Sequence, residues 1–375
     1  MSKTGDERIG DLVRSIEIDT LTEEEEAEIL ASRKAKIAII GVPCDEGVKR
    51  NNGRPGAQQG PSVFRRILAR TGTLENPEFE IDLKQAILIF DLGDVPVPNF
   101  SANRGPDDDQ DELVGFHAEI KRYSRWALSR RMIPFVVGGG NDQSYAVAMA
   151  VVEHVRDNKF AMGGKDFIGV VNIDAHLDVR PLINVSVGAG GDQRRVYRAN
   201  LELRHSGSPF HLLLRDPAFQ SIEGTDTDGD RNQFVEYGAQ GSQCSKEHAT
   251  FVRDNGGRIV WLNELRGGIA PMSLALSRFR GVLDSFGLKV NALVSFDIDA
   301  IRSADCPGVS CPSAVGLTAE EALSICWESG SRDIVVAFDT SEFNPVIEAD
   351  RTGRLLAAMF YNFCLGVAKR QSSRL

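Results

Sequence analysis

The middle of the chain has the sequence Asp166-Phe167-Ile168-Gly169-Val170-Val171-Asn172-Ile173-Asp174-Ala175-His176-Leu177-Asp178. Its first half is mostly apolar, which is typical of a strand buried on both faces. If the extended backbone persists, Asp174, His176 and Asp178 share one face, because alternate side chains of a strand point the same way. Two carboxylates and one imidazole suit a divalent metal ion such as Mn²⁺ or Zn²⁺. The same residue types are common in ordinary loops, so this stretch alone leaves both interpretations open.

A second stretch favours the metal interpretation. Ala292-Leu293-Val294-Ser295-Phe296-Asp297-Ile298-Asp299 is another apolar run that ends in alternating carboxylates. Two buried strands that each end in paired acids bring like charges together, and these repel unless a cation or a proton intervenes. Five ligands with shared carboxylates indicate two metal ions, about 3.5–4 Å apart as in other two-metal sites.

Composition limits the class of protein. The chain has 375 residues, 42% hydrophobic and 26% charged, enough for one large domain or two small ones. Its net charge of −10 argues against a nucleic-acid partner. No apolar run approaches the ~20 residues that span a bilayer, so we expect no membrane segment. Six scattered cysteines and no signal-peptide pattern at the N-terminus predict a cytoplasmic protein.

Strand-like and helix-like stretches alternate along most of the chain. Residues 1–35 are expected to be an N-terminal extension, with a capping box at Thr22–Glu25, and residues 36–375 a single domain. The predicted strands are Ile37–Gly41, Ala86–Asp91, Pro134–Val137, Phe167–Ile173, Arg258–Leu262, Ala292–Asp297 and Ile334–Phe338. The predicted helices are Glu112–Arg131, Ser144–Arg156, Pro271–Phe286, Thr318–Gly330 and Gly353–Lys369. This alternation predicts a three-layer α/β/α fold with a mostly parallel central sheet, whose functional site lies at the carboxyl ends of the strands. Residues 101–112, 187–195 and 224–232 are expected to be surface insertions.

Three other polar positions follow predicted strands or lie in nearby loops. Asn141, after Gly138-Gly139-Gly140, either caps a tight strand-to-helix turn or binds a metal ion through its amide oxygen. Glu342 is either a surface carboxylate or a partner for a cationic nitrogen group. Arg54 is either an ordinary loop arginine or part of a site for an anionic substrate.

Together these motifs resemble the ureohydrolases, the family of arginases, agmatinases and formiminoglutamases. The resemblance extends from about Ile37 to Lys369. Asp174-Ala175-His176-Leu177-Asp178 is similar to the family's Asp-Ala-His-x-Asp signature, and Ser295-Phe296-Asp297-Ile298-Asp299 to its second acidic signature. Glu342-Phe343-Asn344-Pro345 resembles its Glu-x-Asn-Pro segment. The resemblance implies the arginase fold and two Mn²⁺ ions per subunit.

The resemblance also implies a role for each site residue. One ion would bind Asn141, Asp174, Asp178 and Asp297, and the other Asp174, His176, Asp297 and Asp299. A hydroxide between the ions would be the nucleophile. Glu342 would hold the amidino or formimino nitrogen, and Asp178 would accept and transfer the proton.

Departures from the family pattern favour a formiminoglutamase. Arginases and agmatinases usually have His in place of Asn141, and the segment from Ser206 to Phe210 resembles the Ser-Gly-Thr-Pro-Phe of formiminoglutamases. Arg180 stands near the position where arginases have an Asn that contacts the substrate carboxylate, and arginine binds carboxylates in a bidentate manner. We therefore expect Arg180, Arg54 and Ser206 to bind an anionic amino-acid substrate. His205 is expected to be a solvent-facing loop histidine rather than a proton shuttle.

The expected activity is Mn²⁺-dependent hydrolysis of N-formimino-L-glutamate to L-glutamate and formamide, in histidine degradation. The alternatives are another amidine or guanidine hydrolase, such as an arginase or agmatinase, and a non-catalytic arginase-like protein, because Asn141 is a weaker ligand than His. The resemblance also implies a homo-oligomer, a trimer or a hexamer. Cys44 and Cys306 follow predicted strands, so they form either a redox-sensitive disulfide or two free thiols.

Overall fold

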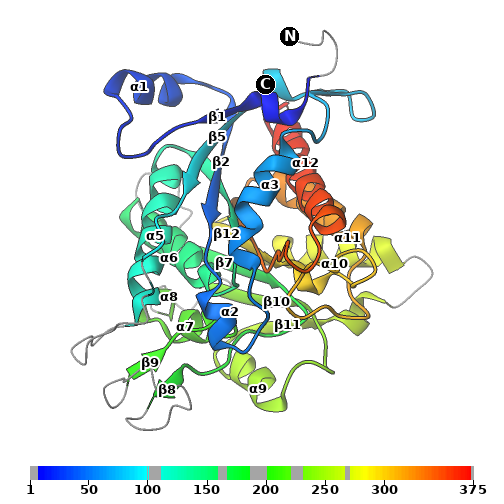
Figure 1. The fold of residues 1–375 in the computed structure, drawn as a ribbon. Coiled ribbons are helices and arrows are strands. Elements are labelled where there is room, and N and C mark those ends of the chain that lie inside the picture. Colours follow the sequence, from blue (N-terminus) through cyan, green and yellow to red (C-terminus); the bar gives the residue numbers. More distant parts are fainter. Residues whose placement is uncertain are drawn as a thin grey trace.

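A nine-stranded parallel sheet forms the centre of the molecule (Figure 1). The computed structural model describes residues 7–98, 100, 111–158, 167–185, 201–220, 231–266 and 271–372. The strand order is β1-β5-β2-β6-β13-β12-β7-β10-β11. In chain order these strands are β1 (Val13–Ser15), β2 (Ala35–Val42), β5 (Ile87–Asp94), β6 (Met132–Gly138), β7 (Phe167–Ile173), β10 (Gln233–Ala239), β11 (Arg258–Trp261), β12 (Val290–Asp297) and β13 (Val335–Ser341). Two small antiparallel pairs lie outside this sheet: β3 (Glu75–Asn76) with β4 (Ile81–Asp82), and β8 (Ile183–Val185) with β9 (Leu201–Leu203).

Helices cover both faces of the sheet, which confirms the expected three-layer fold (Figure 1). One layer contains α3 (Gly60–Leu68), α10 (Pro271–Phe286), α11 (Ala319–Ser331) and α12 (Asp350–Ser372). The other contains α5 (Glu112–Ser129), α6 (Gln143–Asp157), α7 (Pro209–Arg215) and α9 (Lys246–Asp254). The other α-helices of the described residues are α1 (Glu23–Ala31), α2 (Glu46–Arg50), α4 (Leu83–Ala86) and α8 (Pro217–Gln220).

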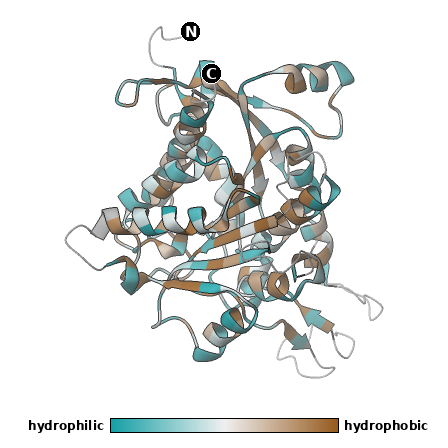
Figure 2. Ribbon diagram, turned by 180° about the vertical axis from the view of Figure 1, so that it is seen from behind, coloured by the Kyte–Doolittle hydropathy of each residue, from teal (hydrophilic) through white to brown (hydrophobic). Residues whose placement is uncertain are grey.

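The core lies between the sheet and each helical layer. Hydrophobic residues run through the central strands, as the second view shows (Figure 2). Phe135 of β6 and Phe338 of β13 stack with ring centroids 5.0 Å apart, and Phe360 of α12 packs edge-on against Phe135 at 4.8 Å. Strands buried on both faces must be apolar throughout, which is why the continuous apolar runs predicted them.

All seven predicted strands and all five predicted helices overlap observed elements. The capping box is also present, since the Thr22 hydroxyl accepts from the Glu25 amide and the Glu25 carboxylate accepts from the Thr22 amide. Two strands of the main sheet, β1 and β10, were not predicted. Because β1 pairs with β5, part of the predicted N-terminal extension joins the main sheet. The boundary at residue 35 stays a prediction, and the predicted insertions fall mostly outside the described residues.

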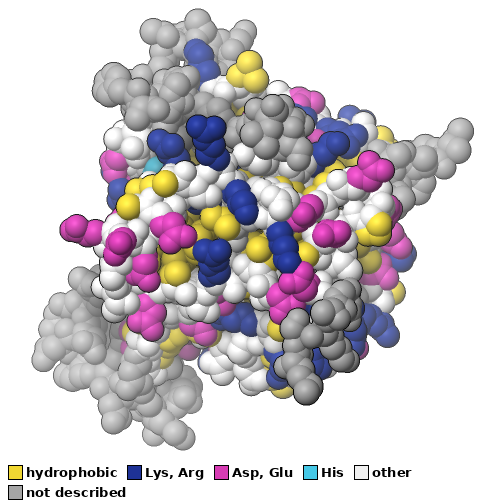
Figure 3. All heavy atoms as spheres, turned by 90° about the horizontal axis from the view of Figure 1, so that it is seen from above, with side chains coloured by type: hydrophobic (Ala, Val, Ile, Leu, Met, Phe, Trp, Pro, Cys, Tyr) yellow, Lys and Arg dark blue, Asp and Glu magenta, His cyan; other side chains and the backbone are white. Residues whose placement is uncertain are grey.

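On the face seen in Figure 3, basic and acidic side chains are interspersed among apolar ones. No helix within the described ranges is long and apolar enough to cross a membrane.

Candidate metal centre and active site

Acidic side chains converge at the carboxyl ends of the neighbouring strands β7 and β12. Two groups of three side chains have candidate ligand atoms within 4.8 Å of one another: Asp174, His176 and Asp299, and Asp174, Asp178 and Asp297. Asp174 belongs to both groups and is fully buried. Neighbouring parallel strands end at the same edge of a sheet, so the pairing of β7 with β12 brings the two acidic stretches together.

The backbone that presents these ligands differs from the expectation. The strand β7 ends at Ile173, so the predicted extension does not persist through Asp178. Asp174 instead accepts a hydrogen bond from the His176 amide at 2.7 Å, and Asp178 has a left-handed φ of 42°. The alternation of faces nevertheless survives, because Ala175, Leu177 and Val179 remain buried in the core. In the second stretch, Asp297 is the last residue of β12. Its side chain accepts a hydrogen bond from the backbone N–H of Asp299 at 2.9 Å and so caps a short 3-10 helix.

The electrostatics of this cluster favour bound cations. Burial and the neighbouring Asp174 raise the pKa of Asp178 to about 8, and burial raises the pKa of Asp299 to about 6. Burial and Asp299 also raise the pKa of Asp297. The charge of Asp299 raises the pKa of His176, whose Nδ1 lies 3.2 Å from the Asp299 Oδ2.

A further observation concerns unsatisfied atoms. The Oδ1 atom of Asp299 is buried and has no hydrogen-bond partner within the described part of the chain. A buried carboxylate oxygen without a partner is costly unless a cation binds it. The donor set, carboxylate oxygens with one imidazole, fits two divalent ions of the Mn²⁺ type.

Asn141 and Glu342 lie beside the cluster. The Asn141 amide nitrogen donates to Asp178 Oδ2 at 2.8 Å, while its amide oxygen accepts from the hydroxyls of Ser144 and Ser341. Rotating the amide by half a turn would direct the oxygen towards the cluster, so the ligand role of Asn141 stays a prediction. Glu342 Oε1 accepts a hydrogen bond from the backbone N–H of Asn141 at 3.2 Å. Burial raises the pKa of Glu342.

The two candidate catalytic residues share an unusual backbone. Asp178 has φ 42° and Glu342 has φ 68°, a region that non-glycine residues rarely adopt. Such conformations cost about 1–3 kcal/mol each and persist where the surrounding structure enforces them. Both carboxylates are thereby held at the wall of one cavity.

This cavity, of about 240 Å³, joins the acidic cluster to the predicted substrate-binding residues. Its lining includes five residues of the cluster and its neighbourhood: His176, Asp178, Asp297, Asp299 and Glu342. It also includes Asn51, Arg54, Arg180, Ser206, Ser310 and Cys311. A larger cavity of about 760 Å³ lies elsewhere, beside Trp261 and Val315, and its lining includes none of the predicted site residues. The chemistry of the smaller cavity therefore identifies the candidate site.

The two arginines of the cavity are held differently. Arg54 donates to the backbone carbonyls of Ser310 and Val309, at 2.9 and 2.7 Å. Arg180 donates from Nη1 to Asn51 Oδ1 at 3.1 Å, and Asn51 in turn donates to the Ser206 hydroxyl at 3.1 Å. Within the described residues, these contacts leave further N–H donors on both guanidinium groups for an anion at the rim.

The expectation that the His205 side chain faces solvent is wrong. Its side chain is buried, Nε2 lies 3.0 Å from the Pro181 carbonyl, and Nδ1 accepts from the Gly207 amide. The ring thus anchors the loop that presents Ser206.

Cys44 and Cys306 are buried free thiols, and burial raises the pKa of both.

With the geometry established, similarity to known proteins decides the family. The family model described as the arginase family matches residues 35–366. The chain belongs to the arginase family. Among solved structures, it is similar to formiminoglutamase from Trypanosoma cruzi with Mn²⁺, at 36% identity and a TM-score of 0.70, covering 92% of this chain and 98% of the other. Among curated proteins, it is 28% identical to a formimidoylglutamase of Geobacillus kaustophilus, covering 89% of this chain and 84% of the other, and 26% identical to one of Staphylococcus carnosus, covering 90% and 88%.

Sequence reasoning missed a row of buried polar residues next to the candidate ligands of this arginase-family site. Glu236 of β10, Asn172 of β7, Ser295 of β12 and Asp339 of β13 are register partners on adjacent strands, and all are fully buried. Asn172 donates to Glu236 at 2.9 Å and to Asp174 at 3.3 Å. A signal was present in the sequence, because Asn172 and Ser295 each interrupt an apolar strand two residues before a predicted ligand, and so share its face.

Proposed function

We propose that this arginase-family chain is a Mn²⁺-dependent formimidoylglutamase, which hydrolyses N-formimino-L-glutamate to L-glutamate and formamide. The carrying observation is that one cavity joins the acidic cluster to two arginines, Arg54 and Arg180. The substrate has two free carboxylates and one formimino group, so it needs positive charge at one end of the site and metal chemistry at the other. The similar proteins named formimidoylglutamase support the same activity.

Two Mn²⁺ ions fit the buried cluster. The first would be held by Asn141, Asp174, Asp178 and Asp297, and the second by Asp174, His176, Asp297 and Asp299. The two groups of converging side chains support this division, since Asp174 belongs to both. When bound, two such ions lower the pKa of water and supply a nucleophile near neutral pH.

The chain's own side chains bind and orient the substrate. Arg54 and Arg180 pair with the two carboxylates, and the Ser206 hydroxyl donates to one of them. Glu342 accepts a hydrogen bond from the formimino N–H and so directs the formimino carbon towards the cluster. Asp178 transfers a proton from the attacking water to the departing amine nitrogen. The bond between the formimino carbon and the glutamate nitrogen breaks, and the oxygen of water remains on formamide.

A comparison of substrates tests this proposal. The Mn²⁺-loaded protein is incubated with N-formimino-L-glutamate, L-arginine or agmatine, and formamide and urea are measured by NMR. We expect formamide and glutamate from the first substrate and no urea from the other two, because cationic substrates are repelled by Arg54 and Arg180. Urea as the faster product would overturn the proposal in favour of an arginase or agmatinase. A protein that neither binds Mn²⁺ nor hydrolyses any of the three would be a non-catalytic member.

The cellular setting belongs to the same proposal. Formimino-glutamate hydrolysis would place the chain in histidine degradation in the cytoplasm, and its six free cysteines are consistent with a reducing compartment. The resemblance supports a homotrimer or homohexamer. Light scattering coupled to size exclusion tests the assembly, and a monomer would contradict it.

A further inference from the structure

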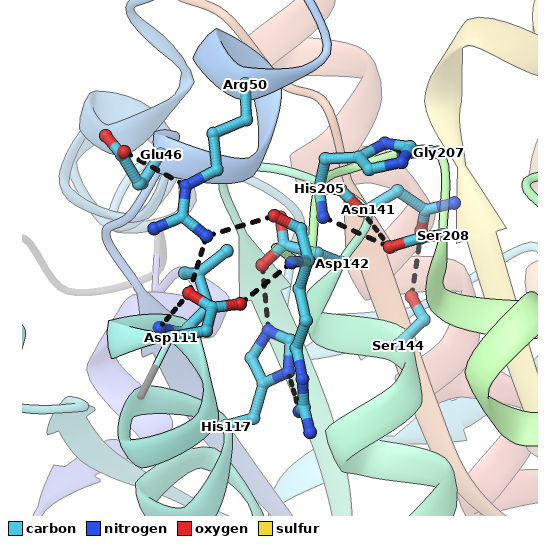
Figure 4. Close-up of polar contacts among 12 residues, drawn as sticks. Glu46, Arg50, Asp111, His117, Asn141, Asp142, Ser144, His205, Gly207 and Ser208 are labelled. Atoms are coloured by element: carbon cyan, nitrogen blue, oxygen red, sulfur yellow. Dashed lines mark hydrogen bonds and ion pairs between the residues drawn. The ribbon is translucent and has the colours of Figure 1, made fainter. Parts of the chain in front are cut away.

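A buried polar network lies beside Asn141 and the loop that contains His205 and Gly207 (Figure 4). We call Arg50, Asp111, His117, Asp142 and Arg204 the His117 network. Its members come from α2, the N-cap of α5, α5 itself, the residue before α6, and the loop before α7. Asp111, His117 and Asp142 are each at most 4% exposed, so their polar atoms depend on one another rather than on water.

His117 lies at the centre of the network, and its two ring nitrogens have different partners. Nδ1 lies 2.8 Å from Arg204 Nη1, and Nε2 lies 2.9 Å from Asp142 Oδ2. Arginine has only donors, so Nδ1 of His117 must accept and Nε2 must donate its proton to Asp142. Burial lowers the pKa of His117, which favours this neutral form. The contacts therefore specify a single tautomer.

The Asp142 end of the network contacts the metal side of the site. Asp142 directly follows Asn141. The Asn141 side chain donates to Asp178, and its backbone N–H donates to Glu342. The other Asp142 carboxylate oxygen packs against Gly47, where a Cβ atom would lie 2.0 Å from it. Asp142 is thus clamped between His117 and α2, and this clamp fixes the backbone at Asn141.

The Arg204 end contacts the substrate side. The Arg204 amide donates to Asp111 at 2.8 Å, and the Arg204 carbonyl accepts from Arg50 at 3.1 Å. In the same loop, the Ser206 amide donates to the Gly47 carbonyl and the Gly207 carbonyl accepts from the Arg180 amide. Asp111 and Arg50 thus hold the Arg204 backbone, and His117 contacts its guanidinium, within the loop that supports both Ser206 and Arg180.

We propose that His117 is a positioning residue that couples the two halves of the site: through Asp142 it sets the Mn²⁺ ligand geometry at Asn141, and through Arg204 it sets the substrate-carboxylate loop. The substrate half rests on the proposed function. The two roles reside on different ring nitrogens, so separate substitutions affect them separately. Nδ1 is bonded to the ring carbon nearest the backbone, so the amide oxygen of a shorter Asn side chain can take the position of Nδ1. The amide nitrogen of a longer Gln side chain can take the position of Nε2.

Two variants test the separation. His117→Asn keeps an acceptor for Arg204 and leaves Asp142 without its donor. We expect its Mn²⁺ affinity, measured by titration calorimetry on the metal-free protein, to fall about 10-fold or more, as when an outer partner of a metal ligand is removed. His117→Gln keeps the donor to Asp142 and leaves Arg204 without its acceptor. We expect its Mn²⁺ affinity to stay within about twofold and its KM for N-formimino-L-glutamate to rise about 10-fold, with kcat within about twofold.

The matched control is the same pair of substitutions at His154, a half-buried histidine of α6 that the His117 network does not include. Neither His154 variant should change Mn²⁺ affinity or KM. If both His117 variants change Mn²⁺ affinity and KM in parallel, or change neither, the coupling role is refuted. If His117→Asn does not fold, Arg204→Gln should reproduce the raised KM of His117→Gln at unchanged Mn²⁺ affinity, and a change in both would refute it. A parent protein without formimino hydrolysis would refute the proposed function, whereas the Mn²⁺ titrations would still decide the role of His117 at Asp142.

Discussion

Replacing Arg180 by alanine should raise the KM for N-formimino-L-glutamate and leave kcat nearly unchanged. Arg180 lines the cavity, and in the proposed function it pairs with a substrate carboxylate and not with the formimino group. It donates one N–H to Asn51 at 3.1 Å, and a guanidinium has five N–H donors, so a bidentate contact with a carboxylate remains available. The substitution removes binding that the ground state and the transition state share.

The magnitude follows from the exposure of Arg180. Hydrogen bonds to charged groups contribute about 1.5–3 kcal/mol, and solvent screening at an exposed side chain favours the lower end, about 1.5–2 kcal/mol. This corresponds to a rise in KM of about 10- to 30-fold, with kcat within about twofold. Steady-state kinetics of the Mn²⁺-loaded protein, followed by glutamate release, provide the assay.

Control variants make the result specific. Arg54→Ala is less informative, because Arg54 also donates to the carbonyls of Val309 and Ser310 and its loss would disturb that loop. Arg354→Ala is the matched control, since Arg354 is an exposed arginine of α12 paired with Asp350. An unchanged KM in an active Arg180→Ala protein would refute the assignment, and so would an equal rise in KM in the Arg354 variant.

Three further predictions concern stability and redox behaviour. Burial raises the pKa of Asp339 to about 7, so the folded state holds a proton that the unfolded chain releases, and stability falls as pH rises from about 4 to 7. Asp339→Asn should remove about 3 kcal/mol of the stability difference between pH 5 and pH 8 in urea unfolding, and an unchanged difference would contradict this. Mn²⁺ at 100 times its Kd should stabilise the parent by about 2.7 kcal/mol in thermal unfolding, reversibly with EDTA, and should not stabilise Asp297→Asn to this extent. Activity of the parent and of Cys44→Ser should not respond to reductant, because Cys44 and Cys306 are buried thiols; a response in the parent alone would restore the disulfide hypothesis.

The strands that bear the candidate ligands could be predicted because local pattern and tertiary role agree there. The stretches before Asp174 and Asp297 are apolar on both faces, as a central parallel strand requires, and polarity changes abruptly at the strand end. The same reasoning missed β10, because Glu236 interrupts its apolar run. Asn172 of β7 donates to that buried carboxylate, and a partner 64 residues away cannot be read from local pattern.

Contacts between distant segments account for the other differences. The bend after Ile173 depends on the hydrogen bond that Asp174 accepts from the His176 amide, which a simple strand pattern does not contain. His205 was expected at the surface because loop histidines usually lie there, but Pro181 and Gly207 enclose it. Likewise, nothing near His117 in the chain indicates that it meets Asp142 and Arg204, since the fold alone brings these segments together.

The most direct test of the metal centre is anomalous diffraction at the manganese edge from crystals grown with Mn²⁺. We expect two peaks about 3.5–4 Å apart, from two ions that both bind Asp174 and Asp297, with His176 and Asp299 on one ion and Asp178 on the other. A single peak, or two peaks without a shared carboxylate, would contradict a binuclear centre at this site.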